Sequence, residues 1–203
     1  MKHYLLPMPF LAALALLTAC EKQEGQSAIY TPTTVGTTLQ YEAHELDNGM
    51  RVNDRLQLMV LQAKQTDGGL EVTYEFSTMQ GTGRDTFLCQ QDGGIFQVNA
   101  DGSKDMLLPP GFPDKTTSWQ SNHITFQVLG RTKANLEGID LYDLIGVWVE
   151  ATTDLPQPLS LWKGKTRILL LPSIGEVETK VLHGGSWVTV NRLVGIGTST
   201  EPM

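Results

Sequence analysis

The sequence has little cysteine, and this limits the covalent chemistry available to the protein. Its 203 residues include two cysteines, Cys20 and Cys89. We assign Cys20 to an N-terminal anchor, described below, so Cys89 has no partner for an intramolecular disulfide. An unpaired thiol in an oxidising compartment could be redox-active. The preceding residues Phe87 and Leu88 favour instead a buried, apolar role for Cys89.

The N-terminal apolar run is too short to cross a membrane. Its uninterrupted part extends from Phe10 to Leu17, whereas a spanning helix needs roughly 20 apolar residues. A short apolar segment behind a basic residue, here Lys2, is typical of a secretory signal peptide, which is removed from the mature protein. We therefore predict that residues 1–19 are a signal peptide.

Basic residues are also scarce. Removal of residues 1–19 takes away one base, Lys2, and no acid, so the mature chain has 15 minus one, or 14, Lys and Arg residues against 22 Asp and Glu, a formal charge of −8. This balance repels phosphate backbones and excludes a nucleic-acid-binding role. It also gives no attraction to anionic lipid head groups, so membrane contact must depend on another feature.

That feature is the sequence Leu17-Thr18-Ala19-Cys20, which resembles the lipobox of bacterial lipoproteins. In that family a diacylglycerol is added to the cysteine thiol, the signal is cut before the cysteine, and the new amine is acylated, for example with palmitate. The resemblance implies three chains on Cys20. One chain binds a membrane only marginally, at about 0.8 kcal/mol per buried CH₂, whereas three would anchor the protein essentially permanently. The alternative is an incidental cysteine near an ordinary cleavage site.

The residue after the anchor bears on the choice of membrane. Glu21 follows Cys20. In enteric bacteria an Asp at this position marks retention in the inner membrane, so the glutamate favours the outer membrane. The expectation is a protein of the bacterial cell envelope, lipid-anchored in the outer membrane and facing the periplasm.

The rest of the chain divides into three predicted parts. Residues 20–37 contain the lipidated cysteine and a small, polar segment typical of a flexible tether. Residues 38–194 form a single β-rich domain, and the mature length of 184 residues (203 − 19) suits one domain or at most two small ones. Residues 195–203 are small and polar, which predicts a disordered tail.

Alternating apolar and polar residues predict ten or eleven short strands in the domain. The cleanest alternation, from Leu70 to Ser77, indicates a strand with one face to the core and one to water. Residues 56–61 are apolar on both faces and predict a central strand. Residues 106–118 contain three prolines and predict a crossing loop packed by Phe112 and Trp119.

The predicted fold class is therefore all-β and antiparallel, with one strongly curved sheet, a half-barrel or a sandwich. No convincing long helix is present. Residues 141–151 leave two readings open: a strand throughout, or a helical turn followed by a strand.

Short motifs at both ends of the domain carry a second resemblance. Tyr30-Thr31-Pro32, Val35-Gly36 and Leu39-Gln40-Tyr41 are similar to the opening of many uncharacterised bacterial lipoproteins and secreted β proteins. Residues 171–177, Leu-Pro-Ser-Ile-Gly-Glu-Val, resemble their Pro-Gly-Val-Gly hairpin turn. This chain differs in having Leu39 where an aromatic residue is usual and Ser173 where Gly is usual. The resemblance implies a curved antiparallel sheet on a lipid anchor and no particular reaction.

The residues with catalytic or metal-binding chemistry are scattered. His44, His123 and His183 have no zinc-site spacing. Two acidic turns lack the EF-hand spacing of a calcium loop; they contain Asp47, Asn48, Asn53 and Asp54 in one case, and Asp101, Ser103 and Asp105 in the other. Residues 183–187, His-Gly-Gly-Ser-Trp, are similar to an esterase oxyanion-hole motif, but no nucleophile elbow exists in the chain. We predict no catalytic residue, metal or cofactor.

Three functional hypotheses follow. The first is a non-catalytic, membrane-anchored binding or structural module that contacts another envelope component. The second is a periplasmic carrier of an apolar ligand or lipid, with an unfilled cavity lined by residues such as Leu58, Phe76 and Phe126. The third and weakest is a hydrolase or metal enzyme, in which folding would bring a histidine and carboxylates into one cleft.

Overall fold

The computed structural model describes residues 27–47, 49, 54–136, 139, 141–153 and 164–198. The predicted signal peptide, Cys20, Asn48 and Asn53 lie outside these residues. No helix within the described ranges is long and apolar enough to cross a membrane.

Twelve antiparallel strands form a single sheet within the described part of the chain. The strands are β1 (Thr37–Ala43), β2 (Arg55–Thr66), β3 (Gly69–Thr78), β4 (Gly81–Cys89), β5 (Ile95–Val98), β6 (Lys104–Leu108), β7 (Ser118–Ser121), β8 (Ile124–Leu136), β9 (Leu141–Thr153), β10 (Gly164–Leu171), β11 (Gly175–His183) and β12 (Ser186–Thr198). Their order across the sheet is β6-β5-β4-β3-β2-β1-β12-β11-β10-β9-β8-β7. The predicted all-β, antiparallel fold class is confirmed.

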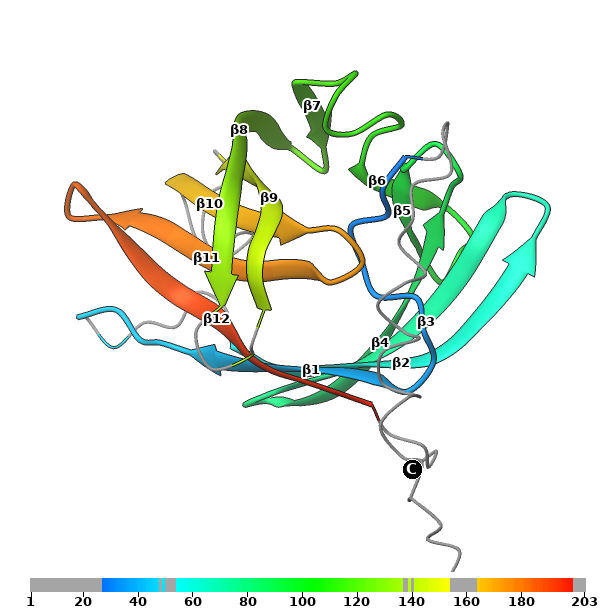
Figure 1. Ribbon diagram of the computed structural model, residues 1–203, viewed down its shortest axis with the longest axis horizontal. Helices are drawn as coiled ribbons and strands as arrows, with labels where there is room; N and C mark the ends of the chain where they lie inside the picture. Colours follow the sequence, from blue (N-terminus) through cyan, green and yellow to red (C-terminus); the bar gives the residue numbers. More distant parts are fainter. Residues whose placement is uncertain are drawn as a thin grey trace, which may run out of the picture.

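The sheet curves into a nearly closed barrel (Figure 1). The first and last strands, β1 and β12, pair at its centre, from Thr37 opposite Thr198 to Ala43 opposite Asn191. The two edge strands, β6 and β7, approach each other across the gap. There the Asn99 and Asn122 amides donate to Asp105 and hold the pKa of its carboxyl below the ordinary value. A side-chain contact, rather than a ladder of backbone bonds, thus links the two edges.

The segment before β1 lies inside the curved sheet. In Figure 1 it runs from the edge strands at the top down through the interior to β1 at the bottom. Tyr30 and Thr31 are 4% and 8% exposed, and the Tyr30 ring meets Phe112 edge to face at 4.9 Å between centroids. Residues 27–36, called the interior segment below, therefore belong to the core. The predicted flexible tether over residues 20–37 is wrong for this part, because the aromatic ring and its neighbours fill space that the sheet alone leaves open.

Backbone hydrogen bonds and one tyrosine hold the interior segment in place. The Ser173 amide donates to the Ile29 carbonyl at 2.7 Å, and the Gly36 amide donates to Val60 at 2.9 Å. The Tyr74 hydroxyl donates to the Pro32 carbonyl at 2.7 Å. Because that hydroxyl proton is used, the Thr31 hydroxyl donates to the Tyr74 oxygen at 2.8 Å. Burial raises the pKa of Tyr74 well above its ordinary value, so the phenol remains a neutral donor.

Several boundaries differ from those predicted. Residues 195–198 were predicted to be part of a disordered tail, but they belong to β12 because β1 supplies their ladder partners. Residues 106–108 were predicted to lie in a loop, but they end β6, paired with β5, and the connecting loop is 109–117. Residues 141–153 form one strand, β9, which settles the alternative of a helical turn.

Other predictions are confirmed. β2 lies inside the sheet between β1 and β3. The middle of β3 alternates as predicted, with Val72 and Tyr74 buried and Glu71, Thr73 and Glu75 half-buried. Phe112 and Trp119 pack together at 5.8 Å between ring centroids. Cys89 is 2% exposed, and burial raises the pKa of its thiol to about 11. This matches the buried, apolar role expected for Cys89.

Candidate functional site

A long β-hairpin bends over the sheet and forms one wall of a cleft. The far halves of β8 and β9, residues 130–136 and 141–146, are called the β8–β9 arm below. A bulge between Val128 and Gly130 shifts the β8–β9 register, and Gly130 has a φ of +140° that side chains rarely allow. Residues Val147 to Thr153 pair with β10, but the arm beyond Val147 continues across the neighbouring strands (Figure 1).

The arm packs closely on β10 where it begins to cross. A Cβ on Gly146 would lie 2.8 Å from Leu169 Cδ1 and 2.9 Å from Leu171 Cδ2. Only a residue without a side chain therefore lets the two layers meet at this distance. Further along the arm the layers separate, and a cleft of about 420 Å³ opens between them.

The cleft has an apolar floor and a polar rim. Its lining residues come from the arm and from β9 to β12: Thr132, Lys133, Ala134, Asn135, Leu136, Trp148, Leu169, Glu178, Arg192 and Leu193. The four aliphatic side chains are nearly buried, from 2% exposed for Leu193 to 7% for Leu136. Lys133 and Asn135 are exposed at the surface. A ligand or partner side chain would thus meet mostly polar groups, above a floor of aliphatic side chains that expose little of their surface.

Two of the charged groups at the rim are paired locally. The Lys133 ammonium lies 3.1 Å from Asp143 on the opposite strand of the arm. The Glu178 carboxylate lies 3.1 Å from the Lys180 ammonium and accepts a hydrogen bond from Thr189 at 3.0 Å. These groups neutralise one another in pairs.

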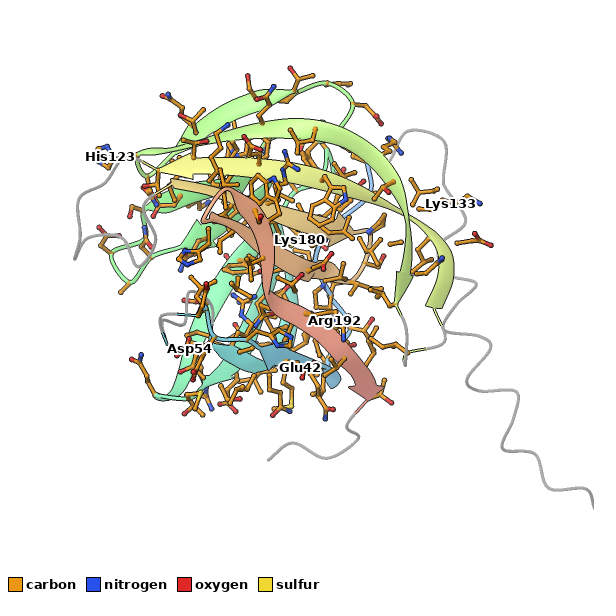
Figure 2. All side chains as sticks on the ribbon, turned by 90° about the vertical axis from the view of Figure 1, so that its left-hand side faces the viewer. Glu42, Asp54, His123, Lys133, Lys180 and Arg192 are labelled. Atoms are coloured by element: carbon orange, nitrogen blue, oxygen red, sulfur yellow. The ribbon has the colours of Figure 1, made fainter. Side chains whose placement is uncertain are left out.

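Arg192 has looser contacts than its neighbours. Its guanidinium is half exposed and lies 3.9 Å from the Glu42 carboxylate, beyond hydrogen-bond distance. Figure 2 shows Lys180, Arg192 and Glu42 one below another on the adjacent strands, with Lys133 across from them on the arm. A guanidinium has five N–H donors, so Arg192 retains donors that a carboxylate, phosphate or amide oxygen in the cleft could accept.

Trp148 provides the aromatic part of the cleft. Its ring packs against the core cluster, and the Lys180 ammonium lies 5.1 Å from the ring centroid. A cation over an indole face is attracted by the ring's negative potential. The pair keeps Lys180 beside the cleft and leaves the indole in contact with the apolar floor.

A second polar group lies near the middle of the sheet. The Tyr41 hydroxyl donates to the Glu176 carbonyl at 3.0 Å, and the Arg55 guanidinium lies 3.2 Å from the Glu176 carboxylate. The Thr179 hydroxyl donates to the same carboxylate. Burial raises the pKa of Tyr41 well above its ordinary value. These contacts join β1, β2 and β11 and indicate a structural role.

One atom beside this group lacks a partner. Asn191 is fully buried, and its side-chain amide donates to the Arg55 carbonyl at 3.0 Å. Its Oδ1 accepts no hydrogen bond from the described residues. An unsatisfied buried acceptor costs about 1–3 kcal/mol.

The predicted catalytic and metal-binding candidates do not gather at one site. His44 lies 3.6 Å from Glu42, and His183 lies 3.2 Å from Asp47, at the ends of different strands. His123 occupies the β7–β8 turn, far from the other labelled side chains in Figure 2. Among the described residues no three His, Cys, Asp or Glu side chains form a metal-binding group.

The acidic and glycine-rich turns have local structural roles. Asp101 accepts hydrogen bonds from the Ser103 hydroxyl and amide, which hold the pKa of its carboxyl below the ordinary value. Gly184 and Gly185, with φ of +58° and +85°, form the two-residue turn between β11 and β12. This is the hairpin geometry that two glycines favour.

The residues expected to line an apolar cavity pack against the protein itself. Leu58 is 9% exposed and belongs to the main core cluster. Phe126 stacks on Trp119, with 4.9 Å between centroids and 8° between planes. The Phe76 ring covers Gly83, whose added Cβ would lie 2.4 Å from it. The structure thus gives each ring a neighbour within the protein.

Sequence reasoning missed the cleft. Glu178, Arg192 and Leu169 lie on separate strands and share no motif, so only the folded sheet brings them together. The local sequence signal for the bend in β8 was Gly130, which begins a charged stretch. A glycine within a strand often marks a bulge, and here the bulge turns β8 over its neighbours.

Comparisons with known proteins show the fold alone. No family model matches the chain, and no curated protein matches it. A solved structure from Bacteroides fragilis NCTC 9343, described as an exported protein with a YmcC-like fold, aligns with a TM-score of 0.57 and 15% identity over 85% of this chain and 100% of its own. Another, from Parabacteroides distasonis ATCC 8503 and described as a lipoprotein, aligns with a TM-score of 0.52 and 12% identity over 84% and 99%.

Proposed function

We propose that the protein is a lipid-anchored lipoprotein of the bacterial cell envelope, held in the outer membrane through Cys20, and that it acts as a non-catalytic binding or interaction module. The lipobox-like residues Leu17 to Cys20 support the anchor. The similar folds of one protein described as exported and another described as a lipoprotein agree with it.

The cleft between the β8–β9 arm and β10 to β12 is the proposed contact site. Its combination of a buried aliphatic floor and a half-exposed Arg192 carries the proposal. Small-molecule and peptide sites commonly pair apolar walls with a few polar groups that fix orientation. The partner would bring an apolar group for the floor and an acceptor oxygen for the guanidinium.

The alternative of an apolar-ligand carrier has less support inside the barrel. Tyr30, Phe112 and Trp119 form a continuous row of rings there, with centroids 4.9 and 5.8 Å apart. An acyl chain would have to displace the interior segment. Native mass spectrometry of the purified protein tests this: a lipid mass that is lost on denaturation would favour the carrier over the interaction module.

The anchor is tested by replacing the acylated residue. In the Cys20→Ser variant no thioether can form, so the protein should leave the membrane fraction and retain its signal peptide or be cut elsewhere. Cell fractionation and intact-mass measurement give the readout. A Cys20→Ser protein that stays membrane-bound, mature and unchanged in amount would contradict the anchor.

The cleft is tested by site-specific photo-crosslinking in the native envelope. A photoreactive amino acid at Asn135, on the rim, should give adducts with the partner. The same amino acid at Gln62, an exposed residue of β2, serves as the matched control. Arg192→Ala in the Asn135 background should lower adduct yield severalfold. Equal adducts at both positions, or no effect of Arg192→Ala, would argue against the cleft as the contact site.

A further inference from the structure

The path of the interior segment limits the orientations that a lipid-anchored domain can adopt relative to the membrane. Ser27 is the first described residue, and it lies against the β4–β5 turn: a Cβ on Gly93 would be 2.8 Å from the Ser27 Cβ. Two residues later, the Ile29 carbonyl is held by Ser173. The chain thus enters the barrel at one fixed place and cannot pivot beyond Ser27 without breaking core contacts.

The entry point lies on a rim made of two connections. The rim consists of the β4–β5 turn, residues 90–94, and the β6–β7 loop, residues 109–117. The Gly111 amide donates to the Asp92 carbonyl at 2.7 Å and ties these connections together. We call this surface the entry rim. In Figure 1 it lies at the top, and β1 lies at the opposite end of the interior segment.

Only six residues, 21–26, separate Cys20 from Ser27. Seven Cα–Cα steps span at most about 25 Å when fully extended. A flexible chain of this length has a root-mean-square span of roughly 15 Å. By comparison, the nine residues of β4 reach about 30 Å from the entry rim to the β3–β4 turn. The tether is therefore shorter than the domain that it holds.

We infer that the entry rim faces the lipid surface. This inference rests on the proposed anchor at Cys20. Electrostatic attraction to the lipid is not needed: the acids of the rim, Asp92 and Asp114, are offset by Lys115 and by Arg131 of β8, which pairs with Asp114.

Two exposed glutamines provide a matched pair of probes. Gln91 lies in the β4–β5 turn on the entry rim, and Gln80 lies in the β3–β4 turn at the other end of β4. Each is changed to Cys in the full-length, acylated protein and labelled with a donor dye at pH 7. The native Cys89 thiol is buried and stays unlabelled. The proteins are reconstituted into liposomes that carry an acceptor dye on their head groups.

Energy transfer to the lipid should be severalfold more efficient from Gln91→Cys than from Gln80→Cys. Equal transfer, or more efficient transfer from Gln80→Cys, would overturn the orientation. Insertion of 20 Gly and Ser residues between Gln26 and Ser27 should reduce the difference, because the chain no longer limits distance. A difference that survives the insertion would overturn the role of tether length.

The anchor and the orientation can fail separately. If the Cys20→Ser protein still binds the liposomes, the anchor is wrong and the distance argument has no starting point. If Cys20→Ser abolishes binding while Gln80→Cys transfers as well as Gln91→Cys, the anchor stands and the orientation is wrong.

Discussion

The barrel interior and the cleft are two spaces bounded by the same sheet, but the first is filled by the chain itself and the second is open. The interior is filled by a segment of the chain itself, in which Tyr30 is 4% exposed and both Tyr74 hydrogen bonds are made. The cleft retains about 420 Å³ and has a half-exposed guanidinium at its rim. The difference shows that an internal space in a curved sheet is not by itself a binding site.

The two spaces also differ in how their polar groups are satisfied. In the interior the Thr31 hydroxyl, Tyr74 phenol and Pro32 carbonyl form a complete chain of hydrogen bonds. The exception among the interior rings is Trp119, whose buried Nε1 donates to no described residue. At the cleft, Arg192 has a carboxylate partner at 3.9 Å. Complete hydrogen bonding fixes one arrangement, whereas a loosely paired arginine can exchange partners at little cost.

The largest effect should come from emptying the filled space. Tyr30→Ala removes a buried ring that contacts Phe112, and such truncations cost about 3–5 kcal/mol of unfolding free energy. Guanidinium unfolding of the mature chain measures the loss. Tyr30→Phe keeps the ring and should cost less than about 1.5 kcal/mol. If Tyr30→Ala unfolded like the parent protein, the interior segment would be a loosely held tether after all.

A smaller effect should come from tightening the wall of the cleft. Gly146→Ala places a methyl 2.8 Å from Leu169 Cδ1 and 3.2 Å from the Leu170 carbonyl, so the arm must shift. Overpacking of this kind costs about 1–3 kcal/mol. Gly197→Ala on β12 is the matched control, since a Cβ there meets nothing within 4 Å. Equal unfolding free energies for the two variants would mean that the arm does not pack closely on β10.

The smallest effect should come from removing the charge of Glu150 on β9, which makes stability depend on pH. Burial alone would raise the pKa of Glu150, but hydrogen bonds from Lys165 and Arg167 outweigh it and hold the pKa below its ordinary value. A lowered folded-state pKa contributes stability that is present above the ordinary carboxyl pKa and is lost as pH falls through the folded value.

Glu150→Gln should therefore cost on the order of 0.5–1 kcal/mol at pH 7, because its partners are partly exposed. The difference from the parent should vanish as the pH falls well below about 4. Urea unfolding at a series of pH values gives the comparison. A difference that stays constant from pH 7 to pH 3 would mean that the Glu150 charge contributes nothing.

The sequence predicted the fold better than the site, for physical reasons. Period-two alternation and turn residues report on local geometry, so the strands of the barrel, including the central β2, could be found from the chain alone. The core position of the interior segment was not predicted, because its polar, proline-containing composition is typical of a tether. Tyr30-Thr31-Pro32 carried the missing signal, since an aromatic residue in a solvated linker would have no reason to be there.

The cleft could not be predicted in the same way. Its position depends on where the β8–β9 arm bends and on which side chains of β9 to β12 then lie beneath it. Gly130 marks the bend, but its direction is set by packing of Gly146 against Leu169 and Leu171. Such a contact is decided by the folded sheet and leaves no spacing pattern in the chain.

The pairing of β1 with β12 has a consequence for the time course of folding. A chain synthesised from its N-terminus delivers the interior segment first, but Tyr74, Ser173 and the whole of β12 come later. Contacts so distant in sequence form slowly. Until Thr198 has emerged, β1 has one edge without its final partner, and exposed edges recruit other strands. The interval between the appearance of β1 and the arrival of the last strand is therefore the period in which this protein is most vulnerable to aggregation.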